Sequence, residues 1–365
     1  MNCLTGETKW PEFIKEHFDG INEPFTAGLE LWPDCNFRCI HCYAQSDRMS
    51  DCASMTTEQI LIVIDQLCEH NCIEIFLTGG EVLLHNDFFE IYKYAKRKGL
   101  MVSVLTNGSL ISQRHIDLWL EYPPELISVT MYGACAETYA AVTGNKKGYE
   151  MFCRGVDLLS ENKIPFEIKC IGMKQNLHDI QAIRRFARGY GLRNAILAWD
   201  IRPMNDGNQE PVNYRVSPSE AFAEELKDEE RRAFWNQLAF DPSRKSRTVR
   251  QAEGRLYPCS IAQQFVFITH DGYMQGCVKA LEPRYHLLSG SFDEGWKFLH
   301  ECFYYKKASE NFPCLKCSKF KYCSQCSASF QDENGDPEKP VSFFCELAEL
   351  EKNYMDQIAG QRGGI

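Results

Sequence analysis

The chain has 365 residues, of which 44% are hydrophobic, so it can bury a substantial core and form two domains. Its formal net charge of −10 argues against an enzyme that holds nucleic acid on a general basic surface. The N-terminus has no basic segment followed by an apolar run, and no stretch approaches the roughly eighteen apolar residues of a membrane span. We therefore expect a cytoplasmic protein with neither a nucleic-acid nor a membrane partner.

A first strand is predicted near residues 25–32, and a loop with Cys35, Cys39 and Cys42 follows it at once. A 4Fe-4S cluster takes four thiolate ligands, so three ligands from one short loop leave one iron open for a group that is not protein. Structural zinc is the alternative, with His41 as a fourth ligand, although zinc sites usually present two Cys-x2-Cys pairs.

The chain then alternates between helical and strand periodicity. A helix over 57–70 carries Ile60, Ile64 and Leu67 on one face, and the threonines before it can cap its start. Further strands are predicted at 73–77, 101–105, 126–131, 165–171 and 195–199, and further helices at 88–99, 112–120, 150–162 and 179–191. Repeated β-α units imply a parallel sheet, whose ligands bind at the carboxyl ends of the strands.

Polar segments follow three of these strands directly. Thr78-Gly79-Gly80-Glu81 comes after the second strand, Thr106-Asn107-Gly108 after the third, and Thr130 lies at the end of the fourth. Taken alone, the glycine pair is typical of a plain strand-to-helix turn, and Thr-Asn-Gly is expected to form a turn as well. Their position at the strand ends favours a ligand site.

In this order, the Cys-x3-Cys-x2-Cys loop and the strand-end segments resemble the radical S-adenosylmethionine (radical SAM) superfamily. The resemblance implies a partial (β/α)6 barrel, a 4Fe-4S cluster on Cys35, Cys39 and Cys42, and cleavage of SAM to a 5′-deoxyadenosyl radical that abstracts hydrogen from the substrate. His41 occupies a position near the adenine where the family usually has an aromatic residue, and a solvent-facing loop histidine is the alternative. The SAM contacts that the resemblance implies are His41, Tyr43, Gly79, Gly80, Glu81, Thr106, Asn107 and Thr130.

A second cysteine system lies in residues 259–345, after a charged and poorly periodic bridge over 203–257. Its seven cysteines are Cys259, Cys277, Cys314, Cys317, Cys323, Cys326 and Cys345. A zinc ribbon is one explanation, but its two Cys-x2-Cys pairs usually lie about fifteen to twenty residues apart, whereas about five separate the two pairs here. That explanation would also leave three of the seven cysteines without a role.

This region resembles a SPASM domain, the small cysteine-rich extension that carries auxiliary clusters in many radical SAM enzymes. The resemblance implies an outer 4Fe-4S cluster on Cys314, Cys317, Cys323 and Cys345, and an inner one on Cys259, Cys277 and Cys326. The inner cluster lacks a fourth cysteine, so its open iron could bind a substrate thiolate, a carboxylate or water. The implied division is an N-terminal segment 1–24, a radical SAM core 25–202, the bridge 203–257, a SPASM domain 258–350 and a tail 351–365.

Eighteen cysteines are far more than ordinary usage, and a disulfide scaffold would need a secreted context that the N-terminus does not indicate. Cys3, Cys52 and Cys302 have no assignment. Five others lie in apolar periodic segments and are interpreted as small buried hydrophobic residues: Cys68, Cys72, Cys135, Cys153 and Cys170.

Together the resemblances imply an enzyme with SAM and three 4Fe-4S clusters that oxidatively modifies a peptide, such as a ribosomally made peptide that receives a thioether or C–C cross-link. Auxiliary clusters would accept the second electron of that oxidation. The implied partners are a peptide or protein substrate and a reductant such as flavodoxin or ferredoxin. Because only some 24 residues precede the first strand, a separate leader-peptide-binding protein is expected, or substrate contacts by Phe234, Trp235 and Tyr257. Core packing is the alternative role of those aromatic residues.

Three other functions stay open at this point. The protein could be a maturase that oxidises a residue of another enzyme, as sulfatase maturases do, or it could oxidise a small molecule such as a tetrapyrrole. It could also be a multi-cluster electron carrier without catalysis. A carrier has no use for the Gly79-Gly80-Glu81 segment or for an open iron, which favours an enzyme.

Overall fold

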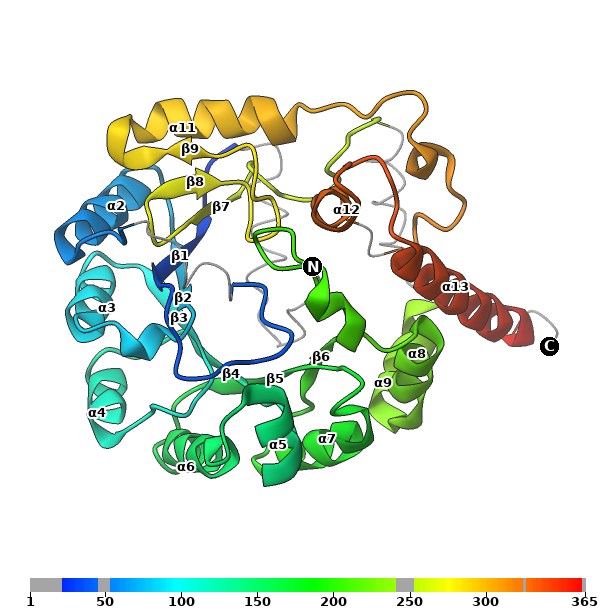
Figure 1. Cartoon of the computed structure of the whole chain (residues 1–365), viewed down its shortest axis with the longest axis horizontal. Coiled ribbons are helices and arrows are strands. Elements are labelled where there is room, and N and C mark those ends of the chain that lie inside the picture. Colours follow the sequence, from blue (N-terminus) through cyan, green and yellow to red (C-terminus); the bar gives the residue numbers. More distant parts are fainter. Residues whose placement is uncertain (1–21, 45–52, 241–252, 324–325, 363–365) are drawn as a thin grey trace.

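The computed structural model describes residues 22–44, 53–240, 253–323 and 326–362. Its centre is a run of six neighbouring parallel strands in chain order, which confirms the predicted parallel (β/α)6 arrangement. Figure 1 shows these strands as an open ring with the helices on its outside. The strands are β1 (Thr26–Trp32), β2 (Glu74–Gly79), β3 (Met101–Thr106), β4 (Leu126–Thr130), β5 (Phe166–Ile171) and β6 (Ile196–Ala198).

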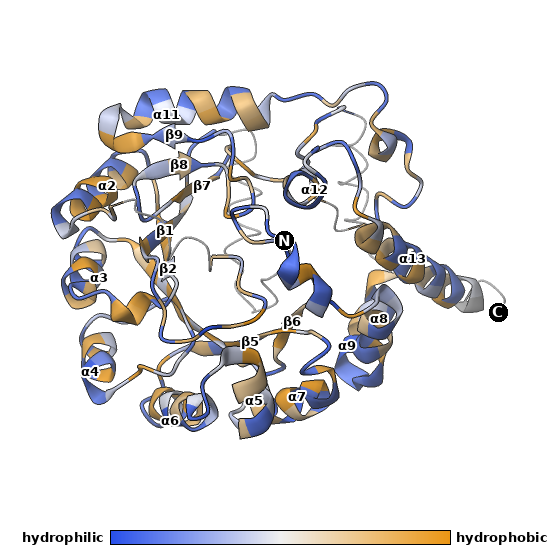
Figure 2. Cartoon of the chain, in the orientation of Figure 1, coloured by the Kyte–Doolittle hydropathy of each residue, from blue (hydrophilic) through white to orange (hydrophobic). Residues whose placement is uncertain are grey.

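The connections between these strands contain the five predicted helices and one that was not predicted, α5. Their bounds are α2 (Thr57–Glu69), α3 (Phe88–Arg97), α4 (Gln113–Glu121), α5 (Ala136–Thr143), α6 (Gly148–Glu161) and α7 (Ile180–Gly189). Both hydrophobic and hydrophilic residues lie along these helices, as expected where one side faces the sheet and the other faces water (Figure 2). Among the described residues, none of the helices has the length and apolar character needed to cross a membrane.

Helix α2 shows how the local sequence specifies an element. Thr56 accepts a hydrogen bond from the Gln59 backbone N–H at 3.2 Å, and Gln59 Oε1 accepts one from the Thr56 backbone at 2.8 Å. This reciprocal capping box satisfies two of the donors that a helix start leaves without partners. The predicted apolar face of Ile60, Ile64 and Leu67 is fully buried against the sheet.

The C-terminal region extends the sheet at its β1 edge. Strand β7 (Phe265–Ile268) pairs in parallel with β1, and β8 (Tyr273–Gln275) and β9 (Tyr285–His286) follow as antiparallel neighbours. Beyond them lie the helices α11 (Phe292–Leu299), α12 (Ser327–Asn334) and α13 (Ser342–Arg362). Residues expected to form a separate domain thus share hydrogen bonds with the central sheet, while the predicted domain boundaries remain predictions.

The bridge contains two helices that the periodicity did not indicate, α8 (Pro218–Lys227) and α9 (Glu229–Leu238). Trp235 is buried beside Phe222 and Met355, and the Tyr257 ring packs against Phe303, so core packing is the role observed for both aromatic residues. Phe234 is partly buried and packs against the same cluster.

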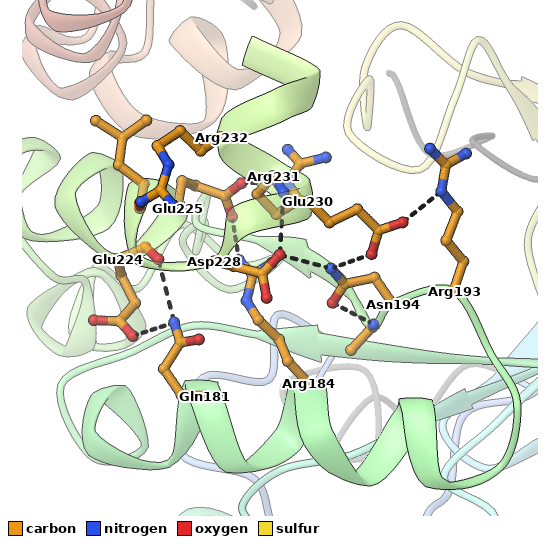
Figure 3. Close-up of polar contacts among 12 residues, drawn as sticks. Gln181, Arg184, Arg193, Asn194, Glu224, Glu225, Asp228, Glu230, Arg231 and Arg232 are labelled. Atoms are coloured by element: carbon orange, nitrogen blue, oxygen red, sulfur yellow. Dashed lines mark hydrogen bonds and ion pairs between the residues drawn. The ribbon is translucent and has the colours of Figure 1, made fainter. Parts of the chain in front are cut away.

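A polar cluster holds the α8–α9 pair onto α7 (Figure 3). Arg184 of α7 is fully buried and lies 3.0 Å from Glu225 and 3.7 Å from Asp228. Glu225 also accepts a hydrogen bond from the Trp199 indole, which follows β6, and one from Arg231 of α9. Since a buried charge is costly without a partner, these ion pairs fix the position of the two helices against the end of the sheet.

We predict that Arg184→Ala lowers the free energy of unfolding by about 3 kcal/mol, because Glu225 and Asp228 lose their fully buried counter-ion. The control is Arg193→Ala, because Arg193 pairs with Glu230 but its side chain is 73% exposed. We expect Arg193→Ala to lower the free energy of unfolding by less than about 1 kcal/mol. Urea unfolding of the two variants measures the difference. Equal losses would contradict the role given to Arg184.

The first residue of β2 makes stability depend on pH. Burial, followed by the nearby Glu125 carboxylate, raises the pKa of Glu74 to about 7. The folded protein therefore keeps a proton that the unfolded chain loses near pH 4.5, so this contribution to stability is present below pH 4.5 and is lost as the pH rises through 7.

We expect Glu74→Gln to raise the melting temperature at about pH 8, to change it little at about pH 4.5, and so to flatten the pH profile between them. Glu121→Gln is the matched control, because the Glu121 side chain is 60% exposed and pairs only loosely, at 3.8 Å, with Lys93. Thermal unfolding monitored by circular dichroism across this pH range provides the measurement. A Glu74→Gln profile parallel to that of the unmodified protein would refute the assignment.

Candidate functional site

The loop with Cys35, Cys39 and Cys42 leaves the carboxyl end of β1, and its backbone is held from three sides. The Gly79-Gly80-Glu81 segment after β2 holds its start, the Thr106-Asn107-Gly108 segment after β3 reaches its first cysteine, and the end of α5 holds its middle. All three thiols lie close enough to the phenol of the partly buried Tyr132 to raise its pKa, after the larger effect of desolvation. The structure therefore brings the predicted cysteines and strand-end motifs into one site.

The glycine pair is needed because the cysteine loop passes directly over it. The Gly80 N–H donates to Trp32 O and the Glu81 N–H donates to Asp34 O, both at 2.8 Å. A Cβ at Gly80 would lie 2.3 Å from Asp34 O, and one at Gly79, whose φ is +155°, would lie 2.4 Å from Trp32 O. Real Cβ atoms do not approach so closely, so only glycine lets the loop lie at this distance.

Glu81 is buried and joins β2 to the segment after β3. Its carboxylate accepts hydrogen bonds from Thr106 Oγ1 at 2.6 Å, from the Asn107 N–H at 2.8 Å and from the Leu83 N–H at 3.1 Å. Burial raises the pKa of Glu81, and these three donors oppose that rise. The side chain thus fixes the two strand ends against each other, and its predicted contact with SAM remains a prediction.

Asn107 does more than form a turn. Its amide nitrogen donates to Asn36 Oδ1 at 2.9 Å and lies 3.7 Å from Cys35 Sγ, while its amide oxygen accepts from Ser109 Oγ at 2.6 Å. Asn36 in turn donates to Ser109 Oγ at 2.8 Å. Asn36 and Ser109 were not predicted from the sequence, although an amide directly after the first cysteine was a visible signal.

The end of α5 holds the middle of the cysteine loop. The Arg38 N–H donates to Thr143 O at 2.8 Å, and the Ile40 N–H donates to Val142 O at 3.0 Å. Phe37 is buried between the Tyr132 and Tyr139 rings, with centroids 6.1 and 6.3 Å away. These contacts orient the half of the loop that carries Cys39 and Cys42.

His41 and Tyr43, both predicted to contact SAM, lie beside the last cysteine of the loop. His41 is partly buried, its ring centroid lies 5.8 Å from that of Tyr132, and desolvation lowers its pKa to about 4. The Arg202 guanidinium covers the Tyr43 ring at 4.2 Å, a contact that was not predicted. Thr130 lies partly exposed at the end of β4, where its backbone oxygen accepts from the Tyr139 hydroxyl at 3.4 Å.

The C-terminal thiols gather in two groups. Cys314 is buried, and the neighbouring Cys323, Cys345 and Cys317 add to the effect of burial in raising its pKa to about 12. Burial, followed by the neighbouring thiols of Cys326 and Cys259, likewise raises the pKa of Cys277 to about 12. The grouping coincides with the outer and inner sets expected from the sequence, while ligation of clusters by them remains a prediction.

The inner group is linked to the carboxyl end of β6. Lys279, two residues after Cys277, pairs with Asp200 at 2.5 Å, and Asp200 lies two residues after the end of β6. Nearby, Arg202 pairs with Asp332 of α12 at 2.8 Å. These ion pairs were not predicted, because their partners lie 79 and 130 positions apart in the sequence.

Of the five cysteines interpreted as packing residues, Cys72 and Cys170 are buried in the core, and Cys68 and Cys153 are partly buried and pack against it. Cys135 is partly buried directly before α5, and its thiol lies 3.3 Å from Thr138 Oγ1. Cys3 and Cys52 lie outside the described residues. Within the described part of the chain, no three His, Cys, Asp or Glu side chains are arranged to hold a single metal ion.

Fold and site define a class of protein, a (β/α)6 enzyme with a cysteine loop after its first strand, and sequence comparison agrees with this. Residues 29–187 match the model of the radical SAM superfamily. Residues 29–187 thus form a radical SAM domain. A radical SAM domain implies a 4Fe-4S cluster and SAM, and three thiols held in one preformed loop suit such a cluster.

Three curated relatives indicate the range of possible activities. The chain is 30% identical to an AdoMet-dependent heme synthase of Methanosarcina barkeri over 47% of this chain and 49% of that protein. It is 27% identical to the subtilosin biosynthesis protein AlbA of Bacillus subtilis over 49% of this chain and 41% of AlbA. It thus spans about half the length of these relatives, or less. An AdoMet-dependent heme synthase of Nitratidesulfovibrio vulgaris matches at 24% identity over 84% of this chain and 88% of that protein.

Solved structures share the fold across most of the chain. Streptococcus suis SuiB bound to S-adenosylmethionine superposes with a TM-score of 0.67 at 13% identity, covering 91% of this chain and 78% of SuiB. The native anSMEcpe structure with bound AdoMet also superposes with a TM-score of 0.67, at 17% identity, covering 93% of this chain and 98% of anSMEcpe. At these identities the likeness shows the fold alone.

We predict that Gly80→Ala disrupts the cysteine loop, because the added Cβ would meet two backbone oxygens that cannot move independently. Overpacking of this kind typically costs roughly 1–3 kcal/mol, so SAM binding should weaken by about tenfold or more. Gly189→Ala is the control, since a Cβ there has nothing within 4 Å. Iron content and SAM titration of both variants provide the test, and normal values for Gly80→Ala would contradict it.

Proposed function

We propose that the protein is a radical SAM/SPASM enzyme that oxidatively modifies a peptide and forms a thioether or C–C cross-link within it. The observation that carries the proposal is the gathering of the C-terminal thiols into two groups, one of them joined to the end of β6 by Lys279 and Asp200. In a radical SAM enzyme, a cluster held by that group would be a candidate electron acceptor for a radical that forms at the strand ends.

The proposed cofactors are SAM and three 4Fe-4S clusters. When bound, they supply a 5′-deoxyadenosyl radical and an acceptor for the second electron of the oxidation. Cys35, Cys39 and Cys42 hold the SAM cluster, and SAM contacts the eight residues named above, from His41 to Thr130. Cys314, Cys317, Cys323 and Cys345 hold the outer cluster, and Cys259, Cys277 and Cys326 hold the inner one.

This chain's own residues contribute positioning. Glu81, Thr106 and Asn107 lock two strand ends and the first cysteine into one hydrogen-bonded unit, which fixes where a ligand of the open iron would lie. Arg202 joins Tyr43, the residue after Cys42, to Asp332 of α12, the helix that directly follows Cys326. Preorganised contacts of this kind hold a reacting atom in place without reorganisation at the moment of reaction.

Similarity to peptide maturases favours a peptide substrate. Related proteins include AlbA and mycofactocin maturase MftC of Mycolicibacterium smegmatis, and SuiB has been solved with its precursor peptide SuiA. The further partners are a flavodoxin or ferredoxin as reductant and a separate leader-peptide-binding protein.

A tetrapyrrole substrate is the second candidate, because the N. vulgaris heme synthase matches this chain over most of its length. A maturase that oxidises a residue of another enzyme has weaker support, since anSMEcpe shares only the fold. The electron-carrier alternative has the least support, because residues 29–187 match the model of the radical SAM superfamily.

The first test is the intact mass of a short peptide encoded beside this gene, after anaerobic co-expression with the enzyme. We expect the loss of one or more pairs of hydrogens, and no change when Cys35, Cys39 and Cys42 are replaced by alanine. An unchanged peptide together with a mass change of Fe-coproporphyrin III in the same reaction would transfer the proposal to the tetrapyrrole.

We further expect Cys277→Ala to retain 5′-deoxyadenosine formation under reducing anaerobic conditions and to lose substrate oxidation. The reason is that the cysteine loop after β1 serves SAM cleavage, whereas the inner thiols serve the later transfer of an electron from the substrate. Cys153→Ala is the matched control, as it removes another half-buried cysteine from the radical SAM core. Full substrate oxidation by Cys277→Ala would refute a role for the inner group.

A further inference from the structure

The inner thiol group has three members, whereas a 4Fe-4S cluster takes four ligands. Cys302, which the sequence analysis left without an assignment, lies in a short π-helical turn (His300–Tyr304) that directly follows α11. It is a free, half-buried cysteine packed against the main core. Single π-helical turns occur often at functional sites, because they re-aim one side chain of a helix.

Backbone pairing brings this turn beside the first inner cysteine. The Leu256 N–H donates to Lys306 O at 3.0 Å, and the Ala308 N–H donates to Gly254 O at 2.9 Å. Arg255 and Lys307 form an antiparallel β-bridge between these two bonds. In an antiparallel pair, moving forward along one segment means moving back along the other, so the chain toward Cys259 runs beside the chain toward Cys302.

Side-chain contacts join the same neighbours. The Tyr257 ring lies 5.2 Å from the Phe303 ring, and a Cβ at Gly276 would lie 3.0 Å from Phe303. Ser327 donates to Leu256 O at 2.8 Å. Tyr257 lies two residues before Cys259, Gly276 lies next to Cys277, and Ser327 lies next to Cys326. These three residues therefore meet at Phe303 or at Leu256, and Phe303 directly follows Cys302.

We infer that Cys302 is the fourth ligand of the inner auxiliary 4Fe-4S cluster, next to Cys259, Cys277 and Cys326. The inference rests on the proposed function, since it presupposes that the inner group holds a cluster. Four protein thiolates leave this cluster no open iron, so it accepts electrons from the substrate without binding it. The substrate thiolate, carboxylate and water considered above are then not its ligands.

The experiment uses the full chain with Cys35, Cys39 and Cys42 replaced by alanine, so that only auxiliary clusters remain. ¹⁵N-imidazole is added to the dithionite-reduced protein, and pulsed EPR detects nitrogen bound to iron. We expect no coupling in this parent and clear coupling when Cys302→Ala opens one iron. Cys153→Ala in the same parent is the control, and it should behave like the parent.

Coupling of the label in the parent would overturn the inference, because an iron would be open with Cys302 present. The inference would also be overturned if neither the parent nor Cys302→Ala showed coupling of the ¹⁵N label and their spectra were identical. If Cys302→Ala fails to fold, Cys302→Ser retains an oxygen ligand, and we expect the midpoint potential of one auxiliary cluster to shift; an unchanged potential would overturn the inference.

Failure of the proposed function has a different signature. Single alanine variants of Cys259, Cys277 and Cys326 in the same parent should each lower the auxiliary iron content. If none of them does, the inner group holds no cluster, and the proposed function fails together with this inference. If they do while Cys302→Ala leaves the spectra unchanged, only the assignment of Cys302 fails.

Discussion

The close approach of the cysteine loop to the Gly79-Gly80 backbone is the constraint on which the rest of the site depends. Two N–H groups of the strand-end segment bind carbonyl groups of the loop at 2.8 Å, and neither glycine has room for a side chain. Backbone hydrogen bonds therefore hold the start of the loop, and they fix the direction in which the chain continues through the three cysteines. The contacts of Asn107 with Asn36 and Cys35, and those of the α5 end with residues 38 and 40, build on that start.

Buried polar groups maintain this arrangement. The Glu81 carboxylate would be costly to bury alone, but it accepts three hydrogen bonds from two different strand ends. A network in which every member has partners specifies one geometry, since any shift would leave a charged oxygen without a donor. At the far side of the sheet, ion pairs of the buried Arg184 with Glu225 and Asp228 position α8 and α9 (Figure 3).

The C-terminal region is integrated with the barrel through its backbone and through its charges. Strand β7 adds to the β1 edge of the sheet, and the pairs Arg202–Asp332, Arg215–Glu333 and Lys279–Asp200 join the segment after β6 to the region of the inner thiols. Such ion pairs contribute little net stability when buried, but breaking one leaves a charge without its partner. Their effect is to hold the inner thiols at a defined position relative to the strand ends.

Strong periodicity made most of the barrel predictable. All six strands and five of its helices were located from apolar patterns, because each buries one face or both against neighbours. Helix α5 is short and was not predicted, so its backbone contacts with the cysteine loop were missed. Helices α8 and α9 are rich in glutamate and arginine, and the charges that hold them in place come from α7 and from each other, which no pattern of apolar residues reveals.

The sequence by itself determined the elements and the local motifs, because capping, turn formation and the spacing of three cysteines depend on residues a few positions apart. It also indicated which C-terminal cysteines belong together, through resemblance. Only the tertiary structure decided what surrounds each motif: that Asn36 and Ser109 support Asn107, that Arg202 covers Tyr43, and that the turn with Cys302 runs toward Cys259. These relations join positions far apart in the chain, and their distances follow from how the sheet and its connections pack.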